Sequence, residues 1–310
     1  MSLPRAVAVL LAAGILVLGC AGSETRQGVE TESLPPAQSS DEGHGGFELG
    51  WLGDVKERRR EPFHIFDNVY YVGLDWVSAY LVSTGDGLIL IDSLYEPFSD
   101  HIIESIRTLG FEPADLKFVI VTHGHWDHAG GAATLQARTG ARVIMSEAGW
   151  HLVQASPGEE NTRFVPPEED LVFRDSDFLT LGETTLHFLV TPGHTEGVLS
   201  ITFPARDGES SHTALAFGGT GLHFAGADRL QEYMDSVERL LEMEGLEVNL
   251  PNHPGTDRLF EKAVLLGERG PDDPHPFVSP AELRAWLQER LSRARQKLAN
   301  DPGSPDQVGD

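Results

Sequence analysis

The chain has 310 residues, of which 40% are hydrophobic, and its 23 basic and 48 acidic residues give a formal net charge of -25. This length provides a core for one large domain or two small ones, and the charge argues against binding to nucleic acid or to anionic membrane surfaces. With a single cysteine, a disulfide within one chain and a cysteine-based zinc cluster are both excluded.

The N-terminus has the composition of an export signal. Residues 1–20 carry one charge, Arg5, and then an apolar run too short to span a bilayer comfortably. The run ends in VLGC at Cys20, which resembles the lipobox of bacterial lipoproteins. The resemblance implies an exported chain anchored through lipid on Cys20, and Ala21 after it implies the outer membrane, facing the periplasm. The alternative is an ordinary signal peptide with an incidental cysteine.

The next segment and the C-terminus are both too polar to bury a core. Residues 21–50 consist largely of Ser, Glu, Gly, Pro and Gln, which predicts a disordered acidic tether. Residues 300–310 predict a similar disordered tail. One folded domain is therefore expected at residues 51–299.

Within that domain the hydrophobic pattern predicts strands with helices between them. In the first half, a strand–turn–strand unit is expected at 63–74, further strands at 77–83, 88–91, 118–121 and 142–145, and helices at 98–109 and 128–138. In the second half, strands are expected near 178–191, 198–204, 213–218 and 247–250, and helices near 228–243, 256–267 and 280–298. The pattern alone indicates an α/β fold with much antiparallel sheet. Residues 154–176 lack periodicity and are expected to form a loop over a site.

A dense group of metal-binding side chains follows the buried strand at 118–121. Three imidazoles and one carboxylate lie within six residues, at His123, His125, Asp127 and His128. Imidazole and carboxylate together suit zinc. His123 and His125 are two residues apart and point the same way in extended backbone, whereas Asp127 and His128 lie where a helix begins. This density at a strand end indicates a metal site.

Two further histidines stand in similar places. His194 follows a strand-like run at 186–190, and His253 follows one at 246–250. Both lie in loops rich in Gly and Pro, where active-site residues are commonly displayed. Their shared context with the first motif makes both of them candidate ligands.

With these motifs in place, residues 63–299 resemble the metallo-β-lactamase superfamily, and most closely its third subclass. The sequences NVYYVG at 68–73, ILID at 89–92 and HPFV at 275–278 are also similar to that group. The resemblance implies a four-layer αββα sandwich with two zinc ions per chain. It implies one zinc held by His123, His125 and His194, and a second held by Asp127, His128 and His253.

One stretch departs from the commoner pattern of the superfamily. Many members carry a metal-bridging aspartate in a Gly-Asp-Thr context, whereas this chain has FGGTG at 217–221. The missing carboxylate favours the lactamase-like arrangement over glyoxalase-like or phosphodiesterase-like relatives. True lactamases have serine or cysteine here, so Thr220 is the matching residue and is expected to hold a metal-bound water.

The function that this resemblance implies is zinc-dependent hydrolysis, in which a metal-bound hydroxide opens a cyclic amide, a β-lactam first of all. Asp127 and Thr220 are the expected catalytic residues, and Trp126, Thr220 and His223 are expected to contact a small-molecule substrate. The acidic Glu196 argues against an anionic β-lactam, and the bulk of Trp126 is expected to narrow the mouth of the site. A lactonase or esterase, and a non-catalytic zinc-binding lipoprotein, therefore stay open, as does the oligomeric state.

Overall fold

The structure is a computed structural model that describes residues 58–155 and 165–300. The predicted signal peptide, Cys20 and the tether lie outside the described residues, as do residues 301–310 and the centre of the predicted loop at 154–176. In the described part of the chain, no helix is both long and apolar enough to cross a membrane.

In the first sheet, the strand that precedes the His123–His128 motif has a parallel neighbour on each side. Its seven strands follow one another in the sheet as they do in the chain. They are β1 (Phe63–Phe66), β2 (Val69–Tyr71), β3 (Tyr80–Ser83), β4 (Leu88–Ile91), β5 (Leu116–Ile120), β6 (Arg142–Met145) and β7 (Leu171–Val172). The strands from β1 to β4 pair antiparallel, and those from β4 to β7 pair parallel. The carboxyl ends of β4, β5 and β6 therefore meet at one edge of the sheet.

The second sheet has five strands in the order β12-β11-β10-β9-β8. They are β8 (Phe178–Leu181), β9 (Thr184–Val190), β10 (Leu199–Asp207), β11 (Ser210–Ala216) and β12 (Leu246–Asn249). Only the β11–β12 pair is parallel. The loops after β9, β11 and β12 carry the remaining candidate site residues.

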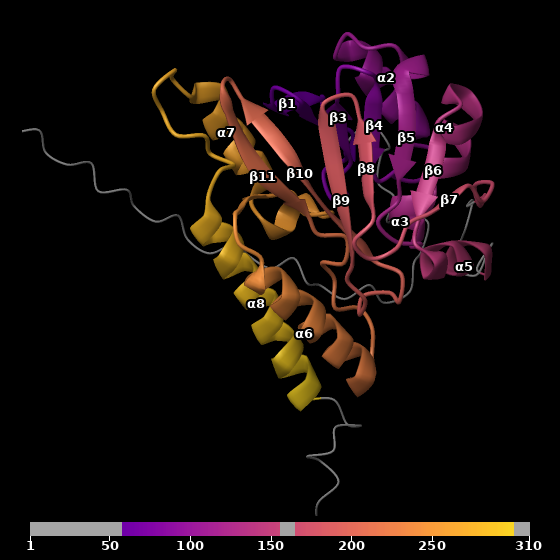
Figure 1. Ribbon diagram of the computed structural model, residues 1–310, viewed down its shortest axis with the longest axis vertical. Helices are drawn as coiled ribbons and strands as arrows, with labels where there is room; N and C mark the ends of the chain where they lie inside the picture. Colours follow the sequence, from indigo (N-terminus) through magenta and orange to yellow (C-terminus); the bar gives the residue numbers. More distant parts are fainter. Residues whose placement is uncertain (1–57, 156–164, 301–310) are drawn as a thin grey trace, which may run out of the picture. The chain divides into compact units, whose positions relative to one another are not determined.

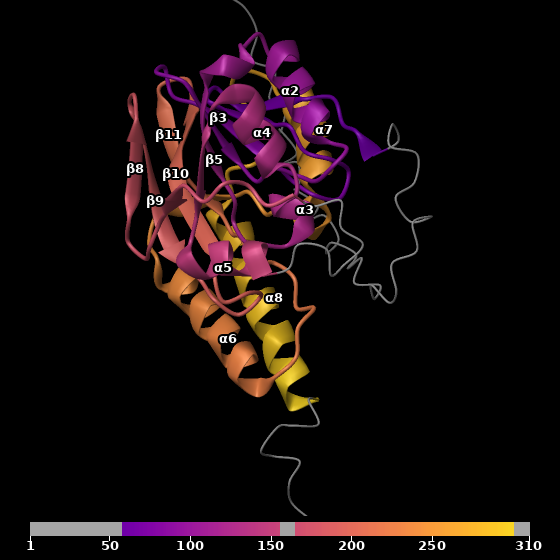
Figure 2. The same cartoon turned by 90° about the vertical axis from the view of Figure 1, so that its right-hand side faces the viewer.

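Helices cover the outer faces of both sheets. The α-helices are α2 (Ser99–Thr108), α3 (Trp126–Ala129), α4 (Ala132–Thr139), α5 (Glu147–Ala155), α6 (Ala227–Glu242), α7 (Leu259–Glu268) and α8 (Pro280–Ala299). The described residues also form the short 3-10 helices η2 (Pro113–Asp115) and η3 (Pro254–Thr256). Figures 1 and 2 show α6 and α8 side by side against the second sheet, with α2 and α4 on the side of the first. At the start of α8, Ser279 accepts a hydrogen bond from the Glu282 amide, which satisfies one free donor of the helix.

Three hydrophobic cores separate the four layers. Along β4, Leu88 and Leu90 pack in the core beneath α2 and α4, while Ile89 and Ile91 pack in the core between the two sheets. Because alternate residues of a strand point to opposite faces, a strand buried on both sides is apolar throughout. The third core joins the second sheet to α6 and α8. The predicted αββα sandwich is thereby confirmed.

Some predicted elements differ from the structure. The helix expected at 128–138 is broken into α3 and α4, and the pattern predicts no helix where α5 forms. At the break, a Cβ on Gly131 would lie 2.2 Å from the Ser93 carbonyl oxygen. The two backbones touch there, so a residue with a side chain does not fit at position 131.

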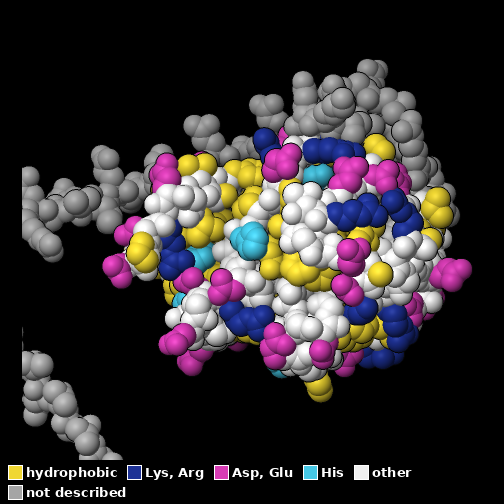
Figure 3. All heavy atoms as spheres, turned by 90° about the horizontal axis from the view of Figure 1, so that it is seen from above, with side chains coloured by type: hydrophobic (Ala, Val, Ile, Leu, Met, Phe, Trp, Pro, Cys, Tyr) yellow, Lys and Arg dark blue, Asp and Glu magenta, His cyan; other side chains and the backbone are white. Residues whose placement is uncertain are grey.

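Acidic side chains on the exposed surface lie among basic ones. On the face seen in Figure 3, Asp and Glu side chains are interspersed with Lys and Arg. Several of them form exposed ion pairs, including Arg59–Glu104 at 2.8 Å. Such exposed ion pairs contribute little to the stability of the fold. The main role of these charged side chains is therefore to keep the surface hydrated.

Candidate metal centre

Three imidazoles converge at the carboxyl end of β5. His123 and His125 lie in the turn after β5, and His194 lies in the loop after β9. The Nε2 atom of His123 lies 3.1 Å from Nδ1 of His125, and Nε2 of His194 lies 3.2 and 3.0 Å from these two atoms. In a tetrahedral zinc site with Zn–N bonds of about 2.0–2.1 Å, two nitrogens lie about 3.3 Å apart. The three nitrogens are therefore spaced to share one ion.

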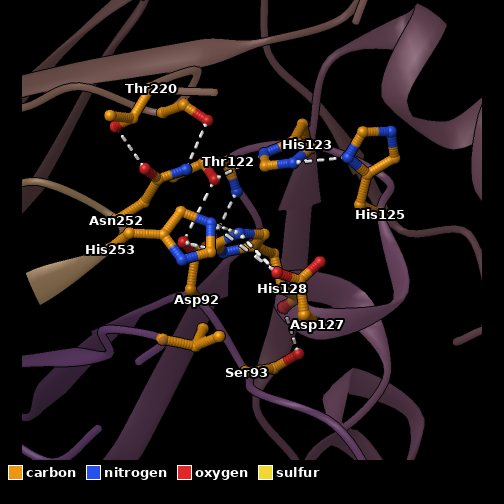
Figure 4. A network of polar contacts seen from close by, with 12 residues as sticks. Asp92, Ser93, Thr122, His123, His125, Asp127, His128, Thr220, Asn252 and His253 are labelled. Carbon is orange, nitrogen blue, oxygen red and sulfur yellow. Dashed lines mark hydrogen bonds and ion pairs between the residues drawn. The ribbon is translucent and has the colours of Figure 1, made fainter. Parts of the chain in front are cut away.

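A second triad lies beside the first. Asp127 and His128 belong to the single turn of α3, and His253 precedes η3. The Asp127 Oδ2 atom lies 3.2 Å from Nε2 of His128 and 3.7 Å from Nε2 of His253, and these two nitrogens are 3.4 Å apart. Within each triad all the candidate ligand atoms lie within 4.8 Å of one another. The structure thus brings together all six predicted ligands in two groups of three, most of which are seen in Figure 4.

Backbone carbonyls fix the tautomers of two ligands. The Nδ1–H of His194 donates to the Gly221 carbonyl at 2.7 Å, and the Nδ1–H of His253 donates to the Trp76 carbonyl at 2.8 Å. Each ring therefore presents an Nε2 lone pair to its triad. Neutral nitrogens packed this closely repel one another unless a cation lies between them, so the residues fit a bound metal.

Asp92 supports one ligand of each triad. Its carboxylate accepts hydrogen bonds from His128 Nδ1 at 2.8 Å, from the Thr122 amide at 2.8 Å and from the Thr122 hydroxyl at 3.1 Å. That hydroxyl in turn lies 3.2 Å from Nδ1 of His123. Asp92 adopts a left-handed backbone conformation with φ of 64°, which an aspartate tolerates better than most residues. Figure 4 shows Asp92 close to His128 and Thr122.

This supporting role of Asp92 was not expected from the sequence. The available signal was a carboxylate that ends the apolar run of β4. Because β4 pairs with β5 in parallel, the residue after β4 lies beside the residues after β5. A polar residue in that place is a candidate to support the metal motif.

The electrostatics of the two triads differ. Burial lowers the pKa of His123 and His194 well below the usual value for histidine, and it lowers that of His253 to about 4. Burial opposes a charge on His128 too, but the carboxylates of Asp127 and Asp92 outweigh it and raise the His128 pKa to about 10. His123 and His194 are thus neutral at pH 7, whereas a metal at the second triad must displace a proton from His128.

Burial would also raise the pKa of Asp127, but the adjacent His128 reverses the effect and holds that pKa well below its usual value. This carboxylate is therefore ionised at neutral pH. An ionised oxygen is both a metal ligand and a strong hydrogen-bond acceptor, which are the two properties expected of Asp127.

Helix α6 holds the loop that carries His194. Arg229 donates from Nη2 to the Gly193 carbonyl at 3.1 Å and to the His194 carbonyl at 2.6 Å. Gly193 has φ of 131°, and a Cβ there would lie 2.4 Å from Cβ of Tyr233. The loop therefore lies directly on α6, and only glycine fits at this contact.

Thr220 lies close to the site but is hydrogen-bonded to a neighbour. Its hydroxyl donates to the Asn252 Oδ1 atom at 2.5 Å, and the amide nitrogen of Asn252 donates to the Gly218 carbonyl at 2.9 Å. Figure 4 shows Thr220 and Asn252 as a pair on one side of the histidines. Thr220 is also buried, at 2% exposure. The expected role in holding a water stays a prediction, and it requires the Thr220 oxygen to act as an acceptor.

The glycines before Thr220 explain why a bridging carboxylate is absent there. A Cβ on Gly218 would lie 2.2 Å from the Leu199 carbonyl oxygen, and one on Gly219 would lie 3.1 Å from Cβ of His194. An aspartate at either position would push against backbone or against a ligand. Among the described residues, the two triads share no carboxylate.

Two of the predicted substrate contacts, Trp126 and His223, are less buried than Thr220. Trp126 is half-buried between two ligands in the sequence, and His223 is exposed. A Cβ on Gly221 would lie 3.1 Å from Cδ2 of His223 and 3.3 Å from Cε1 of His194, which places His223 next to the first triad. Glu196, which argued against an anionic substrate, is also exposed.

Residues 72–208 match a family model described as the metallo-beta-lactamase superfamily. Among solved structures, the subclass B3 metallo-beta-lactamase of Bradyrhizobium japonicum is 30% identical, with a TM-score of 0.73 over 80% of this chain and 97% of that chain. The metallo-beta-lactamase from Legionella gormanii is 27% identical, with a TM-score of 0.74 over 80% of this chain and 98% of that chain.

The curated relatives with similar sequences carry a different name. A hydroxyacylglutathione hydrolase of Methylobacterium is 28% identical over 190 residues, which are 61% of this chain and 65% of that protein. One of Pseudomonas aeruginosa is 33% identical over 117 residues, which are 38% of this chain and 37% of that protein. The chain therefore spans less than two thirds of the length of these relatives.

Proposed function

We propose that this chain, which belongs to the metallo-beta-lactamase superfamily and is a metallo-hydrolase, binds two zinc ions and hydrolyses β-lactams. The observation that carries the proposal is a pair of complete triads with no shared carboxylate among the described residues. A side chain at Gly218 would clash with the Leu199 carbonyl oxygen, and one at Gly219 would press on His194. The match to two lactamase structures over 97% and 98% of their lengths supports it.

The residues present suit the chemistry of such a reaction. His123, His125 and His194 would hold one ion, and Asp127, His128 and His253 the other. When bound, zinc supplies Lewis acidity and makes a water-derived nucleophile available near neutral pH. The ionised Asp127 can accept a hydrogen bond that orients this nucleophile. The proposed reaction uses no serine or cysteine nucleophile and forms no covalent acyl-enzyme.

Chelator-sensitive hydrolysis of a chromogenic cephalosporin by the zinc-loaded chain tests this proposal. We expect turnover that disappears with chelator and returns with added zinc. A matched pair of variants strengthens the test, because His125→Ala removes a ligand whereas His187→Ala changes an exposed histidine of β9. Bound zinc without cephalosporin turnover would refute β-lactam hydrolysis while leaving the metal site intact.

Thioester or ester hydrolysis is the second candidate. It is favoured by the sequence similarity to hydroxyacylglutathione hydrolases, which reaches 33% over 117 residues. The same zinc-loaded preparation should be offered S-lactoylglutathione and a panel of lactones. If turnover of one of these exceeds that of the cephalosporin in kcat/KM, the assignment passes to that substrate class. The non-catalytic alternative is disfavoured, because the chain is a metallo-hydrolase.

Export and lipid attachment are a separate proposal that rests on the N-terminal sequence alone. The VLGC run at Cys20 supports a lipoprotein of the outer membrane. Labelling of expressing cells with an alkyne-bearing fatty acid should tag the wild type and not a Cys20→Ala variant. A tagged Cys20→Ala protein, or an untagged wild type, would refute it.

A further inference from the structure

An aromatic cluster borders the second triad. The ring centroids of Trp76 and Trp126 lie 5.8 Å apart, and that of Tyr95 lies 4.6 Å from Trp126 and 5.9 Å from Trp76. The indole Nε1–H of Trp76 donates to the Tyr95 hydroxyl at 3.3 Å. Tyr95 is buried at 4% exposure, whereas both indoles are only partly buried against the core beneath α2 and α4. Tyr95 thus forms the base of a wall whose surface is the two indoles.

This wall is continuous with the metal ligands. Trp126 begins α3 and stands between His125 and Asp127 in the chain, so its position is fixed by both triads. The Trp76 ring stacks on the ring of His253 with centroids 5.7 Å apart and planes inclined by 29°. The Trp76 carbonyl also accepts the Nδ1–H of that histidine. A substrate group beside Asp127 and His253 would therefore lie next to an indole.

An ion pair lies beside Trp76. Arg58 Nη1 lies 3.4 Å from the Asp75 carboxylate, which precedes Trp76 in the chain. A paired cation and anion leave little net field for a charged substituent. An aromatic face with a neutral surrounding gains most from contact with another flat apolar group.

We infer that Trp76 and Trp126 form a subsite for a neutral aromatic or other apolar substituent next to the bond that is hydrolysed. The inference rests on the proposed function only in placing that bond at the metal centre. The substrate class is then a cyclic amide or ester with an apolar side chain, rather than a bare ring. Burying roughly half of a phenyl ring against the wall should tighten binding about 10-fold.

Two metal-binding thiols that differ only by a benzyl group test the subsite without a reaction. Mercaptoacetate and 2-mercapto-3-phenylpropionate should be titrated by calorimetry into the zinc-loaded full chain, and metal content should be measured first. For the wild type we expect the benzyl compound to bind about 10-fold more tightly. In Trp126→Ala the advantage should fall below about 3-fold, because the ring loses most of its contact area. Phe178→Ala, which removes an exposed phenyl group of β8, is the matched control and should keep the full advantage.

Trp126→Leu is the second variant, for the case in which Trp126→Ala loses metal. It keeps apolar bulk but removes the flat ring, so part of the benzyl advantage should disappear at unchanged zinc content. The inference would be overturned if the benzyl compound bound with the same advantage over mercaptoacetate in the wild type and in the Trp126 variants. It would also be overturned if the wild type showed no such advantage. The thiols report on the subsite even if no β-lactam is turned over, so failure of the proposed function is distinguishable from failure of the subsite.

Discussion

The carboxylate of Asp92 accepts the Nδ1–H of His128 at 2.8 Å, and both side chains are almost completely buried. The same carboxylate receives the amide and the hydroxyl of Thr122, whose hydroxyl lies beside His123. One residue outside the ligand set therefore orients a histidine of each triad. Residues of this kind determine the direction and basicity of metal-binding imidazoles.

Replacing Asp92 by asparagine should weaken metal binding without removing a ligand. The amide offers one oxygen where the carboxylate offers two, so either His128 or Thr122 then faces an NH2 group. We expect zinc affinity to fall about 10- to 100-fold, measured by competition with a chromogenic chelator. The control variant Asp115→Asn changes an exposed position before β5 and should leave the zinc affinity unchanged. Equal affinity in both variants would contradict a supporting role for Asp92.

Removal of single ligands should separate the two metal positions. His194→Ala should empty the three-histidine triad, and His253→Ala should empty the second, because each loses one of three ligands. We therefore expect about one zinc ion per chain in each variant, with residual binding at the intact triad. Elemental analysis after gel filtration measures this. Two ions retained in either variant would show that the altered histidine is not a ligand.

The local motifs were enough to single out the candidate ligands, since four of the six follow directly after one buried strand, whereas their division into two sets came from the family resemblance. The supporting contacts were not predictable, because they join distant parts of the chain. Trp76 and His253 are 177 residues apart, and Thr220 and Asn252 are 32 apart. The need for glycine at position 131 also comes from a distant contact. The periodicity of 128–138 contains no information about the Ser93 carbonyl, which lies where a Gly131 side chain would be.

Thr220 provides a test of whether a buried hydroxyl serves the reaction or only the fold. Thr220→Val leaves the Asn252 oxygen without its donor, which should lower the free energy of unfolding by about 1–3 kcal/mol, measured with urea. Thr220→Ser keeps the hydroxyl and should retain most of that stability. If the hydroxyl also holds a water in the site, kcat should fall in Thr220→Val and recover in Thr220→Ser. A stability loss with unchanged kcat and KM would limit Thr220 to a structural role.

The buried imidazole of His275 predicts how stability depends on pH outside the metal centre. It stacks on Phe66, with Nε2 2.9 Å from the Ile65 carbonyl and Nδ1 accepting from the Phe277 amide. Burial lowers the pKa of His275 in the folded chain below its value in the unfolded chain. Between these two pKa values the unfolded chain binds more protons, so stability rises with pH there and is lost as pH falls below about 6.5.

The variant His275→Gln isolates this contribution from that of the metal ligands. Glutamine does not titrate, so the difference in free energy of unfolding between wild type and variant should shrink as pH falls from 7.5 to 5.5. Urea unfolding of the metal-free proteins at several pH values measures that difference, and the pH dependence of the triads cancels because both proteins share it. A difference that stays constant over this range would mean that His275 keeps its ordinary pKa in the folded chain, in spite of its burial.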